Sequence, residues 1–421
     1  MREEDLTIFD YRREKEIKNT ETVLKERLNG KFEKGTVRTK TAGYIDFSIY
    51  RPDKRQEDGM LPVVFSFHGG GFVLGFYELD GPYCQKLANL AGCMVINIDY
   101  CLAPEFKFPK PVHASYETIC EILKEKDRYG IDSEKVFVCG HSAGGTLAAD
   151  MCILDRAEKK IGIKGQIIDY APLRQSVNEE DRKAIDSSKA ISRNRMLQYI
   201  QWYFEDLDQM QDELASPLLA ELDHLPDILM ISAEYDSLSG EEEQFAKKAQ
   251  TAGTKVIYKK FAGCCHGFTH AELKEYQPEQ AEEAWRLMAD FIKKRTLFHK
   301  FRHRLGHILF FLQMLKALQA VHFHKEGKIQ GAIDMVNILF LNGKLILDDA
   351  QQAFIHAGFH LQTDCLPPLP LFQLFFDFLQ QILRLVLING QIRISHDTER
   401  MGTHHVIVEK KPGNIPLNHL F

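Results

Sequence analysis

The sequence shows little bias toward either sign of charge. Its 53 Lys and Arg residues stand against 59 Asp and Glu residues, which gives a formal net charge of -6 at pH 7. Proteins that bind nucleic acid generally carry a surplus of basic residues that neutralise phosphates. We therefore expect no nucleic acid among the partners of this chain.

The sequence also shows no disulfide pattern, and from its first residues we expect no secretory leader. The segment from Met1 to Leu6 is acidic and has no apolar stretch behind a basic start. The 9 cysteines have no regular spacing, and several of them, such as Cys93, Cys139 and Cys152, fall inside predicted strands or helices. Structural disulfides belong to oxidising compartments. We therefore expect buried free thiols and a cytoplasmic location.

What the sequence does contain is a serine between glycines, in the stretch Gly140-His141-Ser142-Ala143-Gly144-Gly145. Residues 135–139 before it, which are apolar after Lys135, predict a buried strand, and the mostly small residues 146–149 after it predict the start of a helix. Strand, G-x-S-x-G turn and helix together form a nucleophile elbow, which exposes the serine hydroxyl. So sharp a turn leaves no space for a Cβ beside the serine, which explains the glycines. Ser142 is the candidate nucleophile.

A glycine run precedes the elbow in the chain. The stretch His68-Gly69-Gly70-Gly71-Phe72 follows a predicted strand at residues 62–67. Acyl transfer passes through a tetrahedral oxyanion, which preorganised backbone N–H groups stabilise. We therefore expect Gly69 and Gly70, together with Ala143 next to the serine, to form an oxyanion hole.

An acidic residue and a histidine follow in the order expected for such a site, which is serine, acid, histidine. The predicted strand at 227–233 is followed by Glu234-Tyr235-Asp236, at the edge of the sheet to which a parallel strand delivers its last side chains. His266 lies on a glycine-flanked loop after a further strand. Asp236 is the candidate acid and His266 the candidate base, and Glu234 and Glu241 are alternatives to Asp236.

With these motifs in this order, the first ~295 residues resemble the hormone-sensitive-lipase-like group of the α/β-hydrolase superfamily. The matching stretches are His68 to Gly71, Asp99-Tyr100-Cys101-Leu102-Ala103-Pro104-Glu105, Gly140 to Gly145, Ala215-Ser216-Pro217-Leu218, Ala233-Glu234-Tyr235-Asp236 and His266-Gly267-Phe268. The resemblance implies a serine carboxylesterase with Ser142 as nucleophile, His266 as base and Asp236 as its orienting acid. It also implies short-chain acyl esters as substrates, with no cofactor and no metal.

The chain departs from this family pattern at three places. Cys101 stands where the family usually has Arg, so we expect a structural charge contact to be missing there. His141 stands where the family often has Asp. After Asp236 the chain reads Ser237-Leu238-Ser239-Gly240, where the family usually has a Pro and later a charged pair, which weakens the assignment of the acid but not that of the serine.

The order of predicted elements indicates one catalytic domain and an added region. Strands and helices alternate from about residue 36, which predicts an α/β-hydrolase fold with a mostly parallel sheet and helices on both faces. Residues 1–35 and 187–213 are expected to form a helical cap. The composition changes near residue 298, beyond which lie 11 of the 17 histidines. We therefore predict a catalytic domain at 1–297 and a small accessory α+β region at 298–421.

The accessory region has apolar elements of its own. Residues 305–324 and 369–388 predict helices, and Asn342-Gly343 predicts the turn of a hairpin. Asp377 and Arg384 interrupt the second helix, which favours a buried or interface helix over a membrane span. Apolar surface of this extent often marks docking, so a homo-oligomer or a membrane-surface contact through this region is expected.

Two further patterns in this region do not predict a functional site. The run around Asn337 resembles a protein-kinase catalytic loop, but Ala332 stands where the catalytic Asp belongs, so no phosphoryl transfer is predicted. His299, His303 and His307 share one helix face, and we interpret them as a solvated basic face rather than a metal site because no carboxylate or cysteine partner is near.

The predicted function is that of a serine hydrolase that cleaves small-molecule esters through an acyl-enzyme on Ser142. Two alternatives remain. An acyltransferase or a peptidase would use the same triad, and a non-catalytic ligand-binding protein would use the same fold without chemistry.

Overall fold

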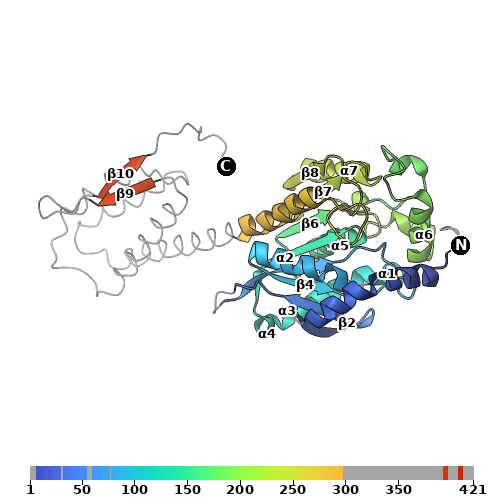
Figure 1. Cartoon of the computed structure of the whole chain (residues 1–421), viewed down its shortest axis with the longest axis horizontal. Helices are drawn as coiled ribbons and strands as arrows, with labels where there is room; N and C mark the ends of the chain where they lie inside the picture. Colours follow the sequence, from blue (N-terminus) through green and yellow to red (C-terminus); the bar gives the residue numbers. More distant parts are fainter. Residues whose placement is uncertain are drawn as a thin grey trace, which may run out of the picture. The chain divides into compact units, whose positions relative to one another are not determined.

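An eight-stranded sheet organises the larger part of the chain (Figure 1). Its strands span Glu33–Thr39 (β1), Gly43–Tyr50 (β2), Leu61–Phe67 (β3), Met94–Ile98 (β4), Ile131–His141 (β5), Gly165–Asp169 (β6), Asp227–Ala233 (β7) and Val256–Phe261 (β8). Their order across the sheet is β1-β2-β4-β3-β5-β6-β7-β8. β1 with β2 and β2 with β4 pair antiparallel, and every other pair is parallel. The predicted mostly parallel sheet is confirmed.

This computed structural model describes residues 6–29, 32–54, 59–75, 77–296, 392–396 and 406–410. The chain divides into two compact units, Met1–Met314 and Leu315–Phe421. In the second unit, β9 (Ile392–His396) and β10 (Val406–Lys410) form an antiparallel pair. The other elements predicted for residues 298–421, the histidines at 299, 303 and 307, and Asn337 lie outside the described residues.

Helices lie before, between and after the strands. They span Ile8–Asn29 (α1), Gly81–Ala91 (α2), Lys110–Lys124 (α3), Lys126–Tyr129 (α4), Ala143–Glu158 (α5), Arg193–Tyr203 (α6) and Ser239–Thr251 (α7), and residues 278–296 form a further helix. Short 3-10 turns occupy Tyr77–Asp80 (η2), Glu179–Arg182 (η3), Leu207–Gln211 (η4) and Pro217–Leu219 (η5). Among the described residues, no helix combines the length and the hydrophobicity that a membrane crossing requires.

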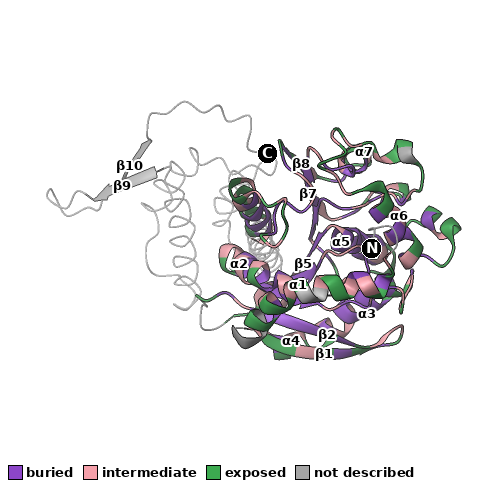
Figure 2. Cartoon of the chain, turned by 45° about the vertical axis from the view of Figure 1, so that its right-hand side comes forward, coloured by how far each residue is buried: buried purple, intermediate pink, exposed green. Residues whose placement is uncertain are grey.

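The inner strands of the sheet are buried on both faces, as the purple ribbon of β5 and β7 in Figure 2 shows, whereas the edge strand β1 is largely exposed. Successive side chains of a strand point to opposite faces. Val63 and Phe65 of β3 pack into one apolar cluster with residues of α3 and α5. Val64, between them, packs into a second cluster with residues of α2 and of the helix at 278–296. Helices therefore cover both faces, which explains why the central strands read as continuous apolar runs.

The two segments predicted as a cap contact each other. Tyr11 of α1 and Tyr199 of α6 share a hydrogen bond of 2.9 Å between their hydroxyl groups. The Tyr11 ring also stacks on Trp202 of α6, with 5.7 Å between the ring centroids. α1 and α6 thus form one packed unit, and their role as a cap stays a prediction.

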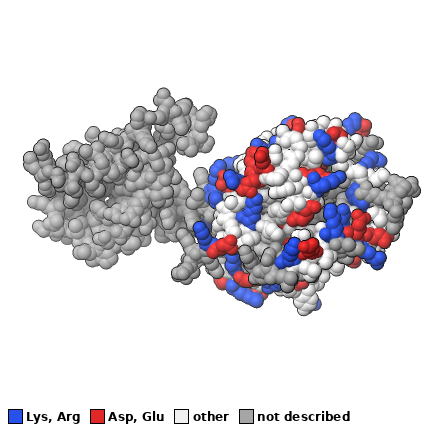
Figure 3. Space-filling model, in the orientation of Figure 1, with Lys and Arg blue, Asp and Glu red and all other residues white. Residues whose placement is uncertain are grey.

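The surface of the first unit mixes charges of both signs. On the face shown in Figure 3, Lys and Arg side chains alternate with Asp and Glu side chains, and neither sign forms a large patch. Such a face produces no strong field for steering a highly charged partner.

Candidate active site

Ser142 lies at the turn between β5 and α5. β5 ends at His141 and α5 begins at Ala143, so the serine alone makes the reversal. Its backbone has φ 53 and ψ -122, a region that residues with a Cβ rarely occupy. Two hydrogen bonds hold this conformation. The Ser142 N–H donates to the Asp169 carbonyl oxygen at 2.9 Å, and the Gly145 N–H donates to the Ser142 carbonyl oxygen at 2.8 Å.

The glycines around Ser142 are required by close backbone contacts. A Cβ on Gly140 would lie 1.9 Å from the carbonyl oxygen of Gly144. A Cβ on Gly144 would lie 2.0 Å from the carbonyl oxygen of Phe67, at the end of β3. Neither clash involves a side chain that can turn away, so the strand-turn-helix geometry excludes any side chain at these positions. The same contact brings the end of β3 against the elbow.

His266 and Asp236 complete a hydrogen-bonded chain with the serine. The Nε2 atom of His266 lies 2.9 Å from the Oγ atom of Ser142. Its Nδ1 atom lies 2.5 Å from the Oδ2 atom of Asp236. Asp236 follows β7 and His266 follows β8, so two neighbouring parallel strands deliver both side chains to the edge where the elbow lies. The structure therefore brings the three predicted residues together.

The two alternative acids lie elsewhere. The Oε2 atom of Glu234 accepts a hydrogen bond of 2.7 Å from the N–H of Gly263. Glu241 pairs with Arg182, with 3.2 Å between Oε2 and Nε. Both carboxylates are thus engaged with other partners, whereas Asp236 is 1% exposed and faces the histidine.

The environment of His266 raises its pKa above the ordinary value. Burial on its own would lower the pKa, because it disfavours the charged imidazolium. The charge of Asp236 and its hydrogen bond to the ring outweigh that effect. A histidine in this position accepts a proton readily when neutral and is stabilised once it is charged.

The glycine loop after β3 lies against the elbow. A Cβ built on Gly69 would lie 3.5 Å from the Cβ of Ser142. Gly70 has φ +122 and Gly71 has φ +62, which the loop's close turn requires. Among the turn and loop hydrogen bonds of the described segments, the N–H groups of Gly69 and Gly70 donate to no backbone carbonyl. That these two groups and the N–H group of Ala143 form an oxyanion hole stays a prediction.

A narrow cavity opens at Ser142. Most of its walls are apolar, and α6 supplies one side of it. The lining residues are Gly71, Phe72, Ser142, Pro172, Gln175, Arg182, Ile191, Met196, Tyr199, Ile200, Tyr203, Phe204 and Leu238. The segment predicted as the second cap element, residues 187–213, thus supplies much of the wall.

A buried polar layer beneath the elbow was not predicted from the sequence. The Nδ1 atom of His141 lies 2.8 Å from the Oδ2 atom of Asp169, and the Thr269 hydroxyl donates to the same oxygen at 3.1 Å. Burial lowers the pKa of His141 to about 3, because it disfavours the charged form of the ring. This contact ties the residue before the nucleophile to the end of β6, where Asp169 also accepts from Ser142 through its backbone.

In the part of the chain that the structure describes, Asp80, His141 and His270 form the group that could hold a metal. Their ligand atoms all lie within 4.8 Å of one another. The Nδ1 atom of His270 lies 2.7 Å from the Tyr170 hydroxyl, which orients its ring. Burial raises the pKa of Asp80 to about 8. Because His141 directly precedes Ser142, this group lies next to the elbow.

A charged residue of α1 contacts the stretch around Cys101. Cys101 is a buried thiol. Arg12 of α1 donates to both carboxylate oxygens of Glu105, at 2.6 and 2.9 Å, and also to the backbone oxygen of Ala103. The basic partner of this stretch therefore comes from a distant segment, which a reading of the local motif could not find.

Comparisons with known proteins find relatives of this chain. The sequence matches the family with the alpha/beta hydrolase fold over residues 64–270. An arylesterase of Saccharolobus solfataricus is 32% identical over 227 residues, which cover 53% of this chain and 72% of that protein. A carboxylesterase of Mycobacterium tuberculosis is 26% identical over 262 residues, which cover 60% of this chain and 81% of that protein.

Solved structures of esterases superpose on this chain. An esterase from Pyrobaculum calidifontis superposes with a TM-score of 0.63 at 31% identity, covering 70% of this chain and 95% of that structure. A thermostable carboxylesterase cloned from a metagenomic library superposes with a TM-score of 0.60 at 30% identity, covering 69% of this chain and 98% of that structure. The likeness spans nearly the whole of each solved enzyme.

Proposed function

Since this chain belongs to the hormone-sensitive-lipase-like family of α/β-hydrolases and is a carboxylesterase by that kinship, we propose that it cleaves small-molecule esters with short acyl chains through an acyl-enzyme on Ser142. The observation that carries this proposal is the hydrogen-bonded chain from Ser142 through His266 to Asp236.

The first half of the reaction begins with proton transfer from Ser142 to His266. Nε2 takes the proton across 2.9 Å while Oγ forms a bond to the ester carbonyl carbon. The displaced electron pair of the carbonyl group moves to its oxygen, and the N–H groups of Gly69, Gly70 and Ala143 stabilise that oxyanion. When the carbon–oxygen bond to the alcohol breaks, His266 returns its proton to the leaving alkoxide. Ser142 is left as an ester.

The second half repeats these steps with water. His266 removes a proton from a water molecule, whose oxygen attacks the acyl-enzyme carbonyl. The tetrahedral intermediate collapses, Ser142 leaves with the proton from His266, and the carboxylic acid departs. Throughout, Asp236 keeps the proton of neutral His266 on Nδ1 and stabilises the imidazolium that forms twice per turnover.

The shape of the cavity supports a short acyl chain. Its volume is ≈ 40 Å³, which is small beside the several hundred Å³ of a typical site for a drug-sized ligand. The aromatic residues Phe72, Tyr203 and Phe204 fill the space around it, and the rings of Phe72 and Tyr203 stack at 4.1 Å. A panel of p-nitrophenyl esters of increasing chain length tests this, and a maximum of kcat/KM at long chains would contradict it.

Two alternatives use the same residues or the same fold. An acyltransferase or peptidase would pass the acyl group from Ser142 to an alcohol, or receive it from an amide, and product analysis with competing alcohols and amines separates them from an esterase. A ligand-binding protein would leave Ser142 unreactive, and a fluorophosphonate probe separates it from a catalyst. We also propose a cytoplasmic location and an accessory role for residues 298–421.

A further inference from the structure

Two buried hydrogen-bond donors line the otherwise apolar cavity at Ser142; one has only a weak acceptor for one of its nitrogen atoms, and the other has none among the described residues. They belong to Arg182, in the turn η3, and to Gln175, in the loop after β6. Their neighbours in the wall include Met196 and Leu238. Buried donors normally have an acceptor, because leaving one unmatched costs about 1–3 kcal/mol.

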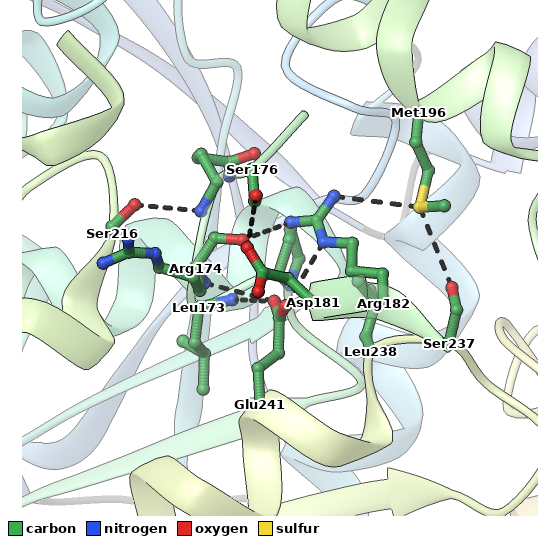
Figure 4. Close-up of polar contacts among 12 residues, drawn as sticks. Leu173, Arg174, Ser176, Asp181, Arg182, Met196, Ser216, Ser237, Leu238 and Glu241 are labelled. Atoms are coloured by element: carbon green, nitrogen blue, oxygen red, sulfur yellow. Dashed lines mark hydrogen bonds and ion pairs between the residues drawn. The ribbon is translucent and has the colours of Figure 1, made fainter. Parts of the chain in front are cut away.

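Arg182 is fixed in place by two strong contacts and one weak contact (Figure 4). Its Nε atom donates to Glu241 at 3.2 Å, and its Nη2 atom donates to the carbonyl oxygen of Arg174 at 2.6 Å. Its Nη1 atom lies 3.7 Å from the sulfur of Met196, and a thioether is a weak acceptor. The side chain is only 6% exposed. One edge of the guanidinium is therefore rigid, buried and poorly satisfied.

Gln175 is equally buried and its amide nitrogen is unmatched. The residue is 5% exposed, and its backbone N–H donates to the Ser216 hydroxyl at 2.9 Å. In the described part of the chain, its Nε2 atom has no hydrogen-bond partner. The backbone is thus anchored, while the side chain brings an unused donor to the cavity wall.

The balanced charge of Arg182 and Glu241 favours a neutral acceptor in the cavity over an anion. Glu241 balances the guanidinium, and its other oxygen accepts from the N–H groups of Leu173 and Arg174 at 2.7 and 3.1 Å. Glu241 is therefore held by three donors. A carboxylate brought into the cavity would lose its hydration without meeting an excess of positive charge. A carbonyl or ether oxygen would accept from both donors at a much smaller cost of desolvation.

We propose that Arg182 and Gln175 form a subsite for a neutral oxygen acceptor on one arm of the ester, so that the preferred substrates are oxygenated rather than plain alkyl esters. This assignment rests on the proposed function, because it places the subsite in the cavity that opens at Ser142.

Matched substrate pairs test the subsite on the full-length protein. Two pairs set p-nitrophenyl hexanoate against its 4-oxo derivative and against its 5-oxo derivative, and they probe the acyl arm. A third pair compares hexyl acetate with 5-oxohexyl acetate and probes the alcohol arm. We expect kcat/KM to be at least about tenfold higher for a keto ester in one of the pairs, as a hydrogen bond to a charged donor allows. We expect p-nitrophenyl hemiglutarate, which carries a carboxylate, to gain no such advantage.

Two variants assign the preference to these residues. Gln175→Met removes the unmatched donor at similar size, and we expect the ratio of kcat/KM for keto and alkyl esters to fall toward one. Arg182→Lys keeps a cation beside Glu241 but loses the planar fork, and it should lower the same ratio. Gln244→Met, at an exposed position on α7, is the matched control and should leave the ratio unchanged.

The outcomes separate this inference from the proposed function. Absence of hydrolysis of every ester by folded protein would overturn the proposed function. Hydrolysis of alkyl esters through Ser142 with no preference for any keto ester would overturn the subsite alone. A keto preference that Gln175→Met and Arg182→Lys both leave intact would likewise overturn it, and a preference for the hemiglutarate would show that the subsite takes an anion instead.

Discussion

Replacement of Asp236 by Asn removes one negative charge and replaces one of the two oxygen acceptors of the side chain by an NH₂ donor. In the native protein, Oδ1 accepts from the N–H of Leu238 at 3.1 Å and Oδ2 faces Nδ1 of His266 at 2.5 Å. An asparagine that keeps the bond to Leu238 must place its NH₂ group toward His266. Nδ1 then has to be an acceptor, so the single proton of the neutral ring moves to Nε2. There it faces the oxygen of Ser142, and the ring cannot accept the serine proton.

The expected effect follows from this change of tautomer. Loss of the base and of the charge that stabilises the imidazolium should lower kcat by about 10⁴-fold, or about 5 kcal/mol in activation free energy. The variant should still fold, because Asn has nearly the shape of Asp and keeps one of its two contacts. The assay is steady-state hydrolysis of a soluble short-chain p-nitrophenyl ester, with the melting temperature measured on the same samples.

The matched control is Glu234→Gln, at the acid two residues earlier. Its side chain accepts from the N–H of Gly263, and a glutamine carbonyl can do the same. We expect kcat within about twofold of the native value, as is usual for a change that preserves a surface hydrogen bond. Retention of more than a tenth of kcat by Asp236→Asn, or an equal loss in Glu234→Gln, would refute the reasoning.

Three further predictions concern the base, the elbow and the accessory region. Because the pKa of His266 is raised and only the neutral ring accepts a proton, kcat/KM should fall as pH drops through a single ionisation above 6.5. The variant His266→Ala should lose all activity. If this variant kept both the rate and the pH profile, the base would be another residue. Gly144→Ala should lower the melting temperature or prevent folding, since its Cβ would lie 2.0 Å from the Phe67 carbonyl oxygen; an unchanged melting curve would contradict the elbow geometry. A chain that ends near Arg295 should keep its turnover, and its complete loss in a folded monomer would place part of the active site beyond that residue.

Local motifs predicted the three side chains that the structure brings together in a hydrogen-bonded chain. The elbow around Ser142 has a fixed backbone shape that few sequences satisfy, so its position in the fold followed from the glycines and the flanking strand. His266 and Asp236 follow from the rule that parallel strands end at one edge of the sheet. The choice of Asp236 over Glu234 needed the structure, because both residues lie at the end of β7.

Contacts between distant segments were beyond the reach of the sequence. Nothing in the order of residues indicates that Arg12 reaches Glu105, or that His141 and His270 meet Asp80 beneath the elbow. The two antiparallel pairings of β2 are likewise a matter of topology rather than of composition. Arg182 and Gln175 could not be predicted as site residues, because a lone Arg or Gln in a loop belongs to no motif. Only the structure shows that both side chains are buried in the wall of the cavity.

Covalent labelling of Ser142 tests the central claim most directly. The full-length protein is treated with a fluorophosphonate, digested and mapped by mass spectrometry, alongside Ser142→Ala. We predict one adduct per chain, located on Ser142, together with loss of hydrolysis. The variant should take up no label, should lose several orders of magnitude in kcat and should melt at the native temperature. An adduct on another residue, or near-normal turnover by the variant, would contradict the account.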